Sequence, residues 1–101
     1  ARVEPATENL LPGNPLSLTS GSSIVTVTEP SHRRSTNDTV VFRNVNGSPG
    51  GLVYSLFENS SGFSITVIDT NSYSFDCGSN ATVTENSGGM FVTAGPVTLT
   101  P

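Results

Sequence analysis

The sequence contains no lysine and no tryptophan, and cysteine and histidine occur only once each. A single cysteine, Cys77, cannot form an internal disulfide, and a zinc site would need several ligands that the chain does not supply. Only 12% of the residues are charged, against about 25% in an average domain. We therefore expect a surface that Ser, Thr and Asn keep in solution instead of charge.

The charges and the apolar runs of the sequence argue against two kinds of partner, a nucleic acid and a membrane. The net charge is −4, and the four cations are Arg2, Arg33, Arg34 and Arg43. Nucleic-acid binding needs clustered cations that displace counterions, so we expect no nucleic-acid partner. No apolar run approaches the roughly 20 residues of a membrane span, and no signal peptide is visible, so we expect no membrane partner.

Catalytic and cofactor-binding motifs are missing as well. There is no G-x-S-x-G elbow, no H-E-x-x-H pair and no Walker loop. The one histidine, His32, lies beside Arg33 and Arg34 in a polar loop, which is typical of a solvated side chain. We therefore predict a protein that is not an enzyme, with no catalytic residues, no cofactor and no metal.

The body of the chain has the alternation of β-strands. Residues 16–19 and 24–28 alternate apolar residues with Ser and Thr around a Ser-Gly-Ser turn, and 39–43 follows a polar loop. Residues 63–67 and 73–77 flank a turn at 69–72, with Phe63, Ile65 and Val67 expected on one face. Residues 81–85, 90–93 and 97–99 predict further strands, and 52–57 fits either a strand or one helical turn.

This spacing predicts an all-β fold. Roughly seven short strands with turns every 8–12 residues suggest a small antiparallel β-sandwich or a partly open barrel. Residues 1–15 contain three prolines and no sustained periodicity, so we predict an extended N-terminal arm followed by a single β-domain over 16–101.

The arm carries apolar residues that are costly to leave in water. Val3, Leu10 and Leu11 could each contribute about 1.5–3 kcal/mol on burial. The arm could therefore dock on its own barrel or on a neighbouring subunit. We predict that these residues anchor the domain on a partner, with Arg33 and Arg34 as charged contacts to acids of that partner, because Arg forks suit carboxylates.

Part of the sequence resembles a known family. Residues Ser20–Thr28 read S-G-S-x-x-V-T-V-T, His32 lies in the following loop, and Asp38–Phe42 and Ile68–Phe75 complete the order. This pattern over residues 14–76 is similar to a repeated small β-domain of tailed-bacteriophage virion proteins. The family's Gly before the Asp is Asn37 here, a residue that tolerates positive φ better than most.

The resemblance implies a non-enzymatic structural protein of the virion, assembled in the host cytoplasm. It would bind other virion proteins, the major capsid protein or the tail proteins, as a head decoration protein or a tail or neck component. We also expect it to be a homo-oligomer or lattice-bound. The alternative is a secreted carbohydrate-binding or adhesin-like module, on which the four N-x-[ST] sequons would carry glycans.

Overall fold

The computed structural model describes residues 9–95 and has nine short strands in two sheets. The four-stranded sheet has the order β1 (Asn9–Leu10), β9 (Thr93–Gly95), β4 (Thr39–Arg43) and β5 (Phe63–Ser64). The five-stranded sheet has the order β6 (Thr66–Asp69), β7 (Ser72–Asp76), β3 (Ile24–Thr28), β2 (Leu16–Leu18) and β8 (Glu85–Ser87). All pairings between these strands are antiparallel, so the predicted all-β sandwich is confirmed.

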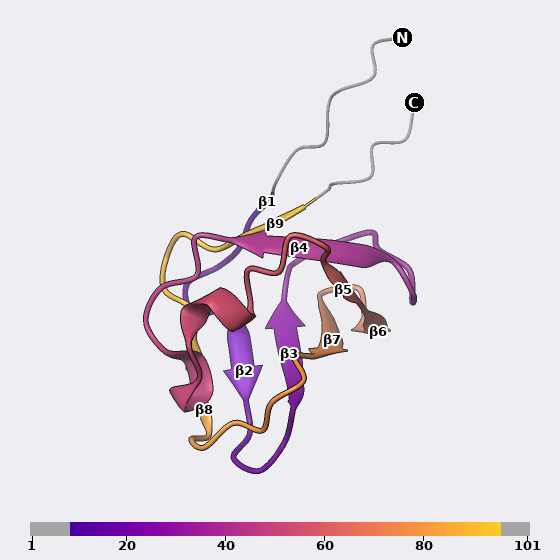
Figure 1. Ribbon diagram of the computed structural model, residues 1–101. Coiled ribbons are helices and arrows are strands. Elements are labelled where there is room, and N and C mark those ends of the chain that lie inside the picture. Colours follow the sequence, from indigo (N-terminus) through magenta and orange to yellow (C-terminus); the bar gives the residue numbers. More distant parts are fainter. Residues whose placement is uncertain (1–8, 96–101) are drawn as a thin grey trace, which may run out of the picture.

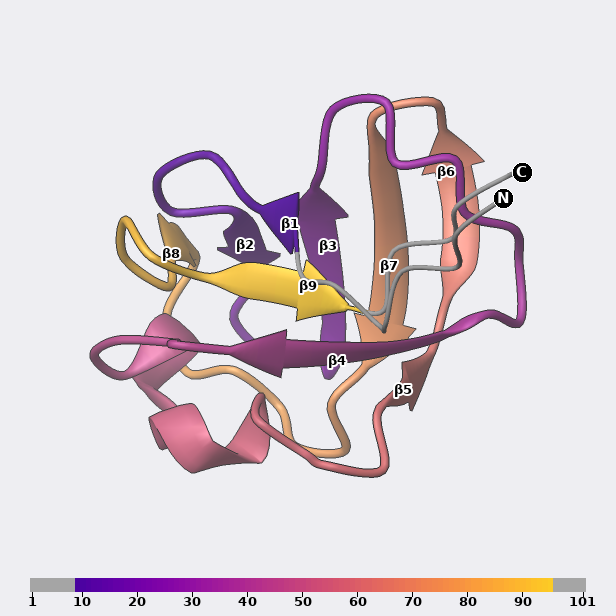
Figure 2. The same ribbon diagram turned by 90° about the horizontal axis from the view of Figure 1, so that it is seen from above.

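The two sheets form the layers of the sandwich, with the four-stranded sheet above the other in Figure 1. Seen from above, β4 and β9 run across β3 and β7 rather than along them (Figure 2). The chain passes from one sheet to the other between β5 and β6, where the buried Ile65 separates the two strands. Such a switch of sheets makes the corner of a sandwich whose strands cross at a steep angle.

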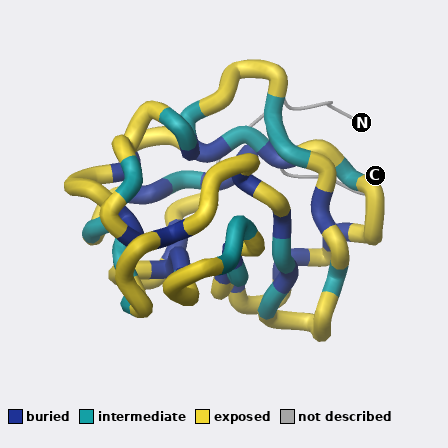
Figure 3. The backbone as a smooth tube through the Cα atoms, turned by 60° about the horizontal axis from the view of Figure 1, so that its bottom comes forward, coloured by how far each residue is buried: buried dark blue, intermediate teal, exposed yellow. Residues whose placement is uncertain are grey.

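The core lies between the sheets and is built from alternate positions of the strands. In β3 and in β4 the second and fourth residues are buried while the end residues are exposed, which is the pattern of a half-buried strand. Phe42 of β4 stacks on Phe75 of β7 at 5.2 Å between ring centroids, and Phe63 of β5 lies 4.4 Å from the same ring. Figure 3 shows that the buried stretches line the inside while the connecting loops are exposed.

Of the two alternatives predicted for residues 52–57, a strand or one helical turn, the chain forms the turn, as the 3-10 helix η2 (Tyr54–Leu56), after another at η1 (Pro49–Gly51). Other predicted boundaries were wrong. Phe63 does not continue into the 73–77 hairpin, because β5 pairs with β4 and only β6 pairs with β7. Within 81–85, strand pairing is limited to an isolated bridge at Ala81 and to Glu85, the first residue of β8.

The end of the chain also differs from its prediction. The strand expected over 90–93 begins only at Thr93, as β9. The strand predicted over 97–99 lies outside the described residues.

The predicted arm is part of the sandwich from Asn9 onward. β1 pairs with β9 in the register Asn9↔Ala94 and Leu10↔Thr93, and Leu11 is 3% exposed within the hydrophobic core. Residues 9–11 of the predicted arm therefore pack on the protein's own sandwich. Local composition could not reveal this, since the pairing partner lies more than 80 residues away along the chain.

Candidate functional site

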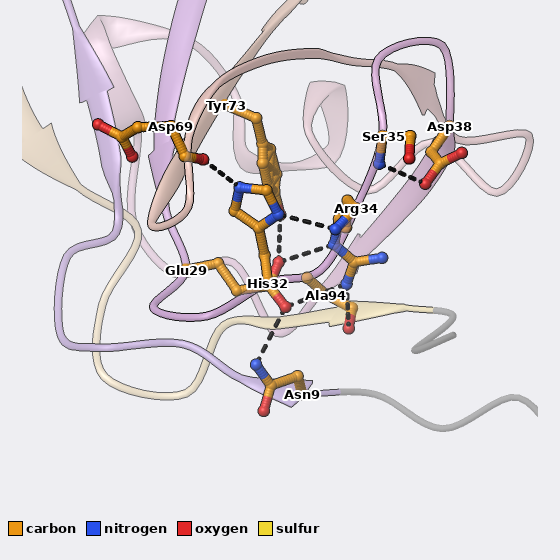
Figure 4. A network of polar contacts seen from close by, with 9 residues as sticks. All are labelled: Asn9, Glu29, His32, Arg34, Ser35, Asp38, Asp69, Tyr73 and Ala94. Carbon is orange, nitrogen blue, oxygen red and sulfur yellow. Dashed lines mark hydrogen bonds and ion pairs between the residues drawn. The ribbon is translucent and has the colours of Figure 1, made fainter. Parts of the chain in front are cut away.

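A buried carboxylate, that of Glu29, lies between the two sheets directly after β3. Its Oε1 accepts hydrogen bonds from Arg34 Nε at 2.9 Å and from the Tyr73 hydroxyl at 2.5 Å. Its Oε2 accepts from Arg34 Nη2 at 3.1 Å and from the Asn9 side-chain amide at 3.0 Å. Figure 4 shows the three donors converging on Glu29 from the loop, from β7 and from β1. We call Asn9, Glu29, His32, Arg34 and Tyr73 the polar lock.

The charges of the polar lock compensate each other. Arg34 and Glu29 form an ion pair with side chains 3% and 2% exposed, and the guanidinium also donates to the Ala94 carbonyl at 3.4 Å. Burial lowers the pKa of Arg34, but the hydrogen bond and charge of Glu29 more than offset this, so that the pKa is raised. The pKa of the Tyr73 hydroxyl is strongly raised, by burial first and then by its bond to Glu29.

His32 belongs to the same cluster, so the prediction of a solvated loop histidine was wrong. Its Nε2 donates to the Asp69 carbonyl at 2.7 Å, and its Nδ1 accepts from the Arg34 backbone N–H at 2.9 Å. This pair of partners assigns the proton to Nε2. The ring meets Tyr73 edge-on at 5.2 Å. Both nitrogens are thus engaged in holding the loop in place.

The loop after β3 is tied to the turn between β6 and β7 by backbone bonds. The N–H groups of Glu29 and His32 donate to the carbonyls of Asn71 and Thr70, and Ser31 N–H donates to the Asn71 side chain. The turn itself is closed by the exposed Asp69. Its pKa is lowered, chiefly by the hydrogen bond from the Asn71 backbone and then by that from Ser72.

The predicted contact residues lie in different environments. Leu10 is 62% exposed and Arg33 is exposed at a φ of 55°, so both are accessible. Leu11 and Arg34 are buried in the core and in the polar lock, so the predictions of an apolar anchor and of a charged surface contact were wrong for these two. Val3 lies outside the described residues.

Sequence reasoning missed the centre of the cluster. No role was predicted for Glu29, and Asn9 and Tyr73 were not singled out as its polar partners. The one available signal was the isolated acid at the end of the Val/Thr strand, five residues before an arginine. That spacing has no meaning until the fold of the loop is known.

The described residues hold little else that could carry chemistry. Among residues 9–95, no group of three or more His, Cys, Asp and Glu side chains could hold a metal ion. Within the same range, no helix has the length and apolar character that crossing a membrane requires. What the polar lock can do chemically is hold a loop, a turn and strand β1 together.

Comparison with known proteins gives a structural likeness and no sequence relative. No family model matches the chain, and no curated protein matches its sequence. The fold is similar to part of a solved structure, the phage phi92 endosialidase, with a TM-score of 0.67 and 22% identity. The match covers 89% of this chain and 12% of that one. At this level of identity the likeness shows a shared fold, found there as a small part of a much longer protein.

Proposed function

We propose that this chain is a non-enzymatic structural domain of a tailed-phage virion that binds other subunits of the particle. The observation that carries the proposal is the likeness of nearly the whole domain to one part of a phage protein. The order of motifs typical of phage virion β-domains, noted in the sequence, supports the same class independently.

The positions of these motifs in the fold add to that support. The S-G-S-x-x-V-T-V-T segment forms the turn before β3 and β3 itself, and Ile68–Phe75 forms the β6–β7 hairpin that pairs with it. His32 and Tyr73, one from the loop and one from the hairpin, meet in the polar lock. The motif residues that this chain shares with the phage β-domains therefore have a structural role in the sandwich, and no catalytic role is needed to explain them.

The non-enzymatic part of the proposal rests on His32. A general base must have a ring nitrogen free to accept a proton from its substrate or nucleophile. Here Nδ1 already accepts from Arg34 N–H, and Nε2 donates to the Asp69 carbonyl. The histidine is therefore better explained as a structural residue than as a catalytic one.

Partners would be the major capsid protein or the tail proteins, with head decoration, neck and tail as possible positions. Within this proposal, Val3 of residues 1–8 is an apolar anchor and the exposed Arg33 is a charged contact. Repeated copies on a symmetric particle add avidity, so each single contact can be weak.

Deletion of residues 1–8 tests the proposal while leaving β1 intact. The truncated chain and the full chain are mixed with assembled particles lacking this protein, and the bound copies are counted after sedimentation. We expect the full chain to sediment with the particle and the truncated chain to stay in solution. Failure of the full chain to bind heads, necks or tails would refute the virion assignment.

Arg33→Ser serves as the matched test of the charged contact. It removes the cation from an exposed loop position without touching the buried Arg34. Binding should weaken measurably, and the weakening should shrink as salt is raised, because exposed ion pairs are screened. Equal binding of both chains at low salt would remove Arg33 from the interface.

A carbohydrate-binding module is the second candidate, favoured by one observation. The similar solved structure is named as an endosialidase, and this fold forms part of it. An array of glycans that includes sialic acid polymers distinguishes the two candidates. Specific binding of a glycan by the isolated chain would favour this second function.

A further inference from the structure

The exposed side of the sandwich beside β1 carries an apolar surface. Leu10, Met90 and Phe91 are 62%, 64% and 70% exposed, and Phe91 is the most exposed large apolar side chain among the described residues. They lie on one two-stranded ribbon, since Leu11 N–H donates to the Val92 carbonyl and Asn14 N–H to the Gly89 carbonyl, each at 2.9 Å. Met90 crosses over Gly13, where an added Cβ would come within 2.5 Å of its sulfur. We call Leu10, Pro12, Met90 and Phe91 the apolar ribbon.

The ribbon is also a free edge of the four-stranded sheet. β1 is an end strand of the order β1-β9-β4-β5. Leu11 N–H donates to the carbonyl of Val92, the residue directly before β9, and in the same register Asn9 faces Ala94 of β9. Successive residues of a strand point their N–H and C=O groups to opposite sides, so those of Leu10 point away from β9. A further strand could add to the sheet there by backbone hydrogen bonds.

The charge distribution indicates what that strand belongs to. Residues 9–28 and 86–101 contain no charged side chain, although the chain carries a net charge of −4. In a two-fold contact the groups on the axis meet their own copies, so an uncharged residue there suits self-contact, where a charged one would repel itself.

Glu29 and Arg34, which contact Asn9 and Ala94, compensate each other's charge in the polar lock. The nearest other charge on a strand of the four-stranded sheet is Arg43, opposite Thr93 on β4. Five strand spacings would separate its two copies across a shared sheet, or roughly 24 Å, well beyond the Debye length.

We propose that a second copy of this chain docks on the β1 edge of the apolar ribbon, with β1 of each copy pairing antiparallel across a two-fold axis at Leu10. The Leu10 N–H of each copy donates to the Leu10 carbonyl of the other, and the two four-stranded sheets become continuous. Pro12 has no N–H with which to extend the new ladder of hydrogen bonds. The contact therefore stays short and joins two copies instead of many. The inference does not depend on the virion assignment, since it concerns the isolated chain.

Sedimentation equilibrium of the purified chain over a range of concentrations tests the proposal. We expect a monomer–dimer equilibrium that Leu10→Lys weakens by at least about tenfold, because it places two cations side by side at the axis. Ile68→Lys is the matched control. Ile68 is 56% exposed on β6, the edge strand of the other sheet, and its replacement should leave the dimer constant unchanged. A chain that stays monomeric up to about 1 mM would overturn the proposal.

A covalent trap gives a second measurement that needs no change of charge. Directly opposed residues of a hydrogen-bonded antiparallel pair have Cα atoms about 5.5 Å apart, within the range that a disulfide spans. Oxidised Leu10→Cys should therefore form a covalent dimer, while Ile68→Cys should not. Wild-type chain, whose Cys77 is buried, gives the background. Equal cross-linking of both variants would refute the axis at Leu10. A dimer that fails to bind particles would refute the virion proposal alone.

Discussion

Glu29 accepts hydrogen bonds from three other side chains at a depth where almost none of its surface meets water. Its carboxylate joins the loop after β3, the β6–β7 hairpin and β1, which are far apart in the sequence. A buried ion pair adds little net stability against an apolar replacement of both partners, but removal of one partner leaves an uncompensated charge. The Glu29–Arg34 pair therefore makes the fold sensitive to the loss of either charge.

Replacement of Glu29 by Gln tests this dependence. Gln keeps the size and one carbonyl acceptor but removes the charge, so the buried Arg34 guanidinium loses its counter-ion. We expect the free energy of unfolding in urea to fall by about 3–5 kcal/mol. Asp76→Asn, which neutralises an exposed acid at the end of β7, should change it by less than about 0.5 kcal/mol. A fall in the free energy of unfolding of less than about 1 kcal/mol in Glu29→Gln would show that the fold does not depend on the Glu29–Arg34 ion pair.

Tyr73 makes stability depend on pH at the alkaline end. Its pKa is raised in the folded protein by burial and by the Glu29 bond, while an unfolded tyrosine ionises near pH 10. Above that pH the unfolded chain binds fewer protons than the folded one, so stability falls by up to about 1.4 kcal/mol per pH unit. Below that pH this group has no effect on stability.

Tyrosinate absorbance measures this directly. The chain has two tyrosines, so Tyr54→Phe leaves Tyr73 as the only reporter. We expect its absorbance change to coincide with alkaline unfolding, followed by circular dichroism in the same titration. In Tyr73→Phe, the decline in stability above about pH 10 should become shallower. Ionisation of Tyr73 in a chain that is still folded, near the ordinary tyrosine pKa, would contradict the burial argument.

Two neighbouring leucines at the end of β1 lie in opposite environments, since Leu10 faces solvent and Leu11, directly after the strand, fills the core. Leu11→Ala should lower the free energy of unfolding by about 2–5 kcal/mol through lost burial and a cavity. Leu10→Ala should change it by less than about 0.5 kcal/mol in dilute solution. Urea denaturation of both variants measures the difference. Equal effects would mean that this segment is not part of the sandwich.

The same segment shows what a sequence can and cannot predict at the scale of elements. β3, β4 and β7 were predicted because five residues of alternation identify a half-buried strand. β1, β5 and β8 have two or three residues each, too few to show a period. Their existence depends on strands far along the chain. The polar lock was unpredictable for the same reason, since Tyr73 lies 44 residues from Glu29.

For the whole molecule, the pairing of Asn9 with Ala94 has a consequence for connectivity. The first and the last strand of the described chain, β1 and β9, are neighbours in the four-stranded sheet (Figure 1). A peptide link from residue 101 to residue 1 would connect Gly95 with Asn9, which lie in neighbouring strands, at a small cost in loop entropy. The order of the strands along the chain could then be changed without changing the sheets.

A circular permutant opened between Ser60 and Ser61 tests this. Both residues are exposed in the loop before β5, and residues 1–8 and 96–101 serve as the linker. We expect a β-sheet circular dichroism spectrum and a Tm within about 8 °C of the wild type, since about 1 kcal/mol shifts Tm by 4–8 °C in a domain of this size. Opening the chain between Val25 and Thr26 should abolish folding instead, because it cuts β3, the central strand of the five-stranded sheet. Folding of both permutants, or of neither, would show that the β1–β9 pair does not set the tolerated connectivity.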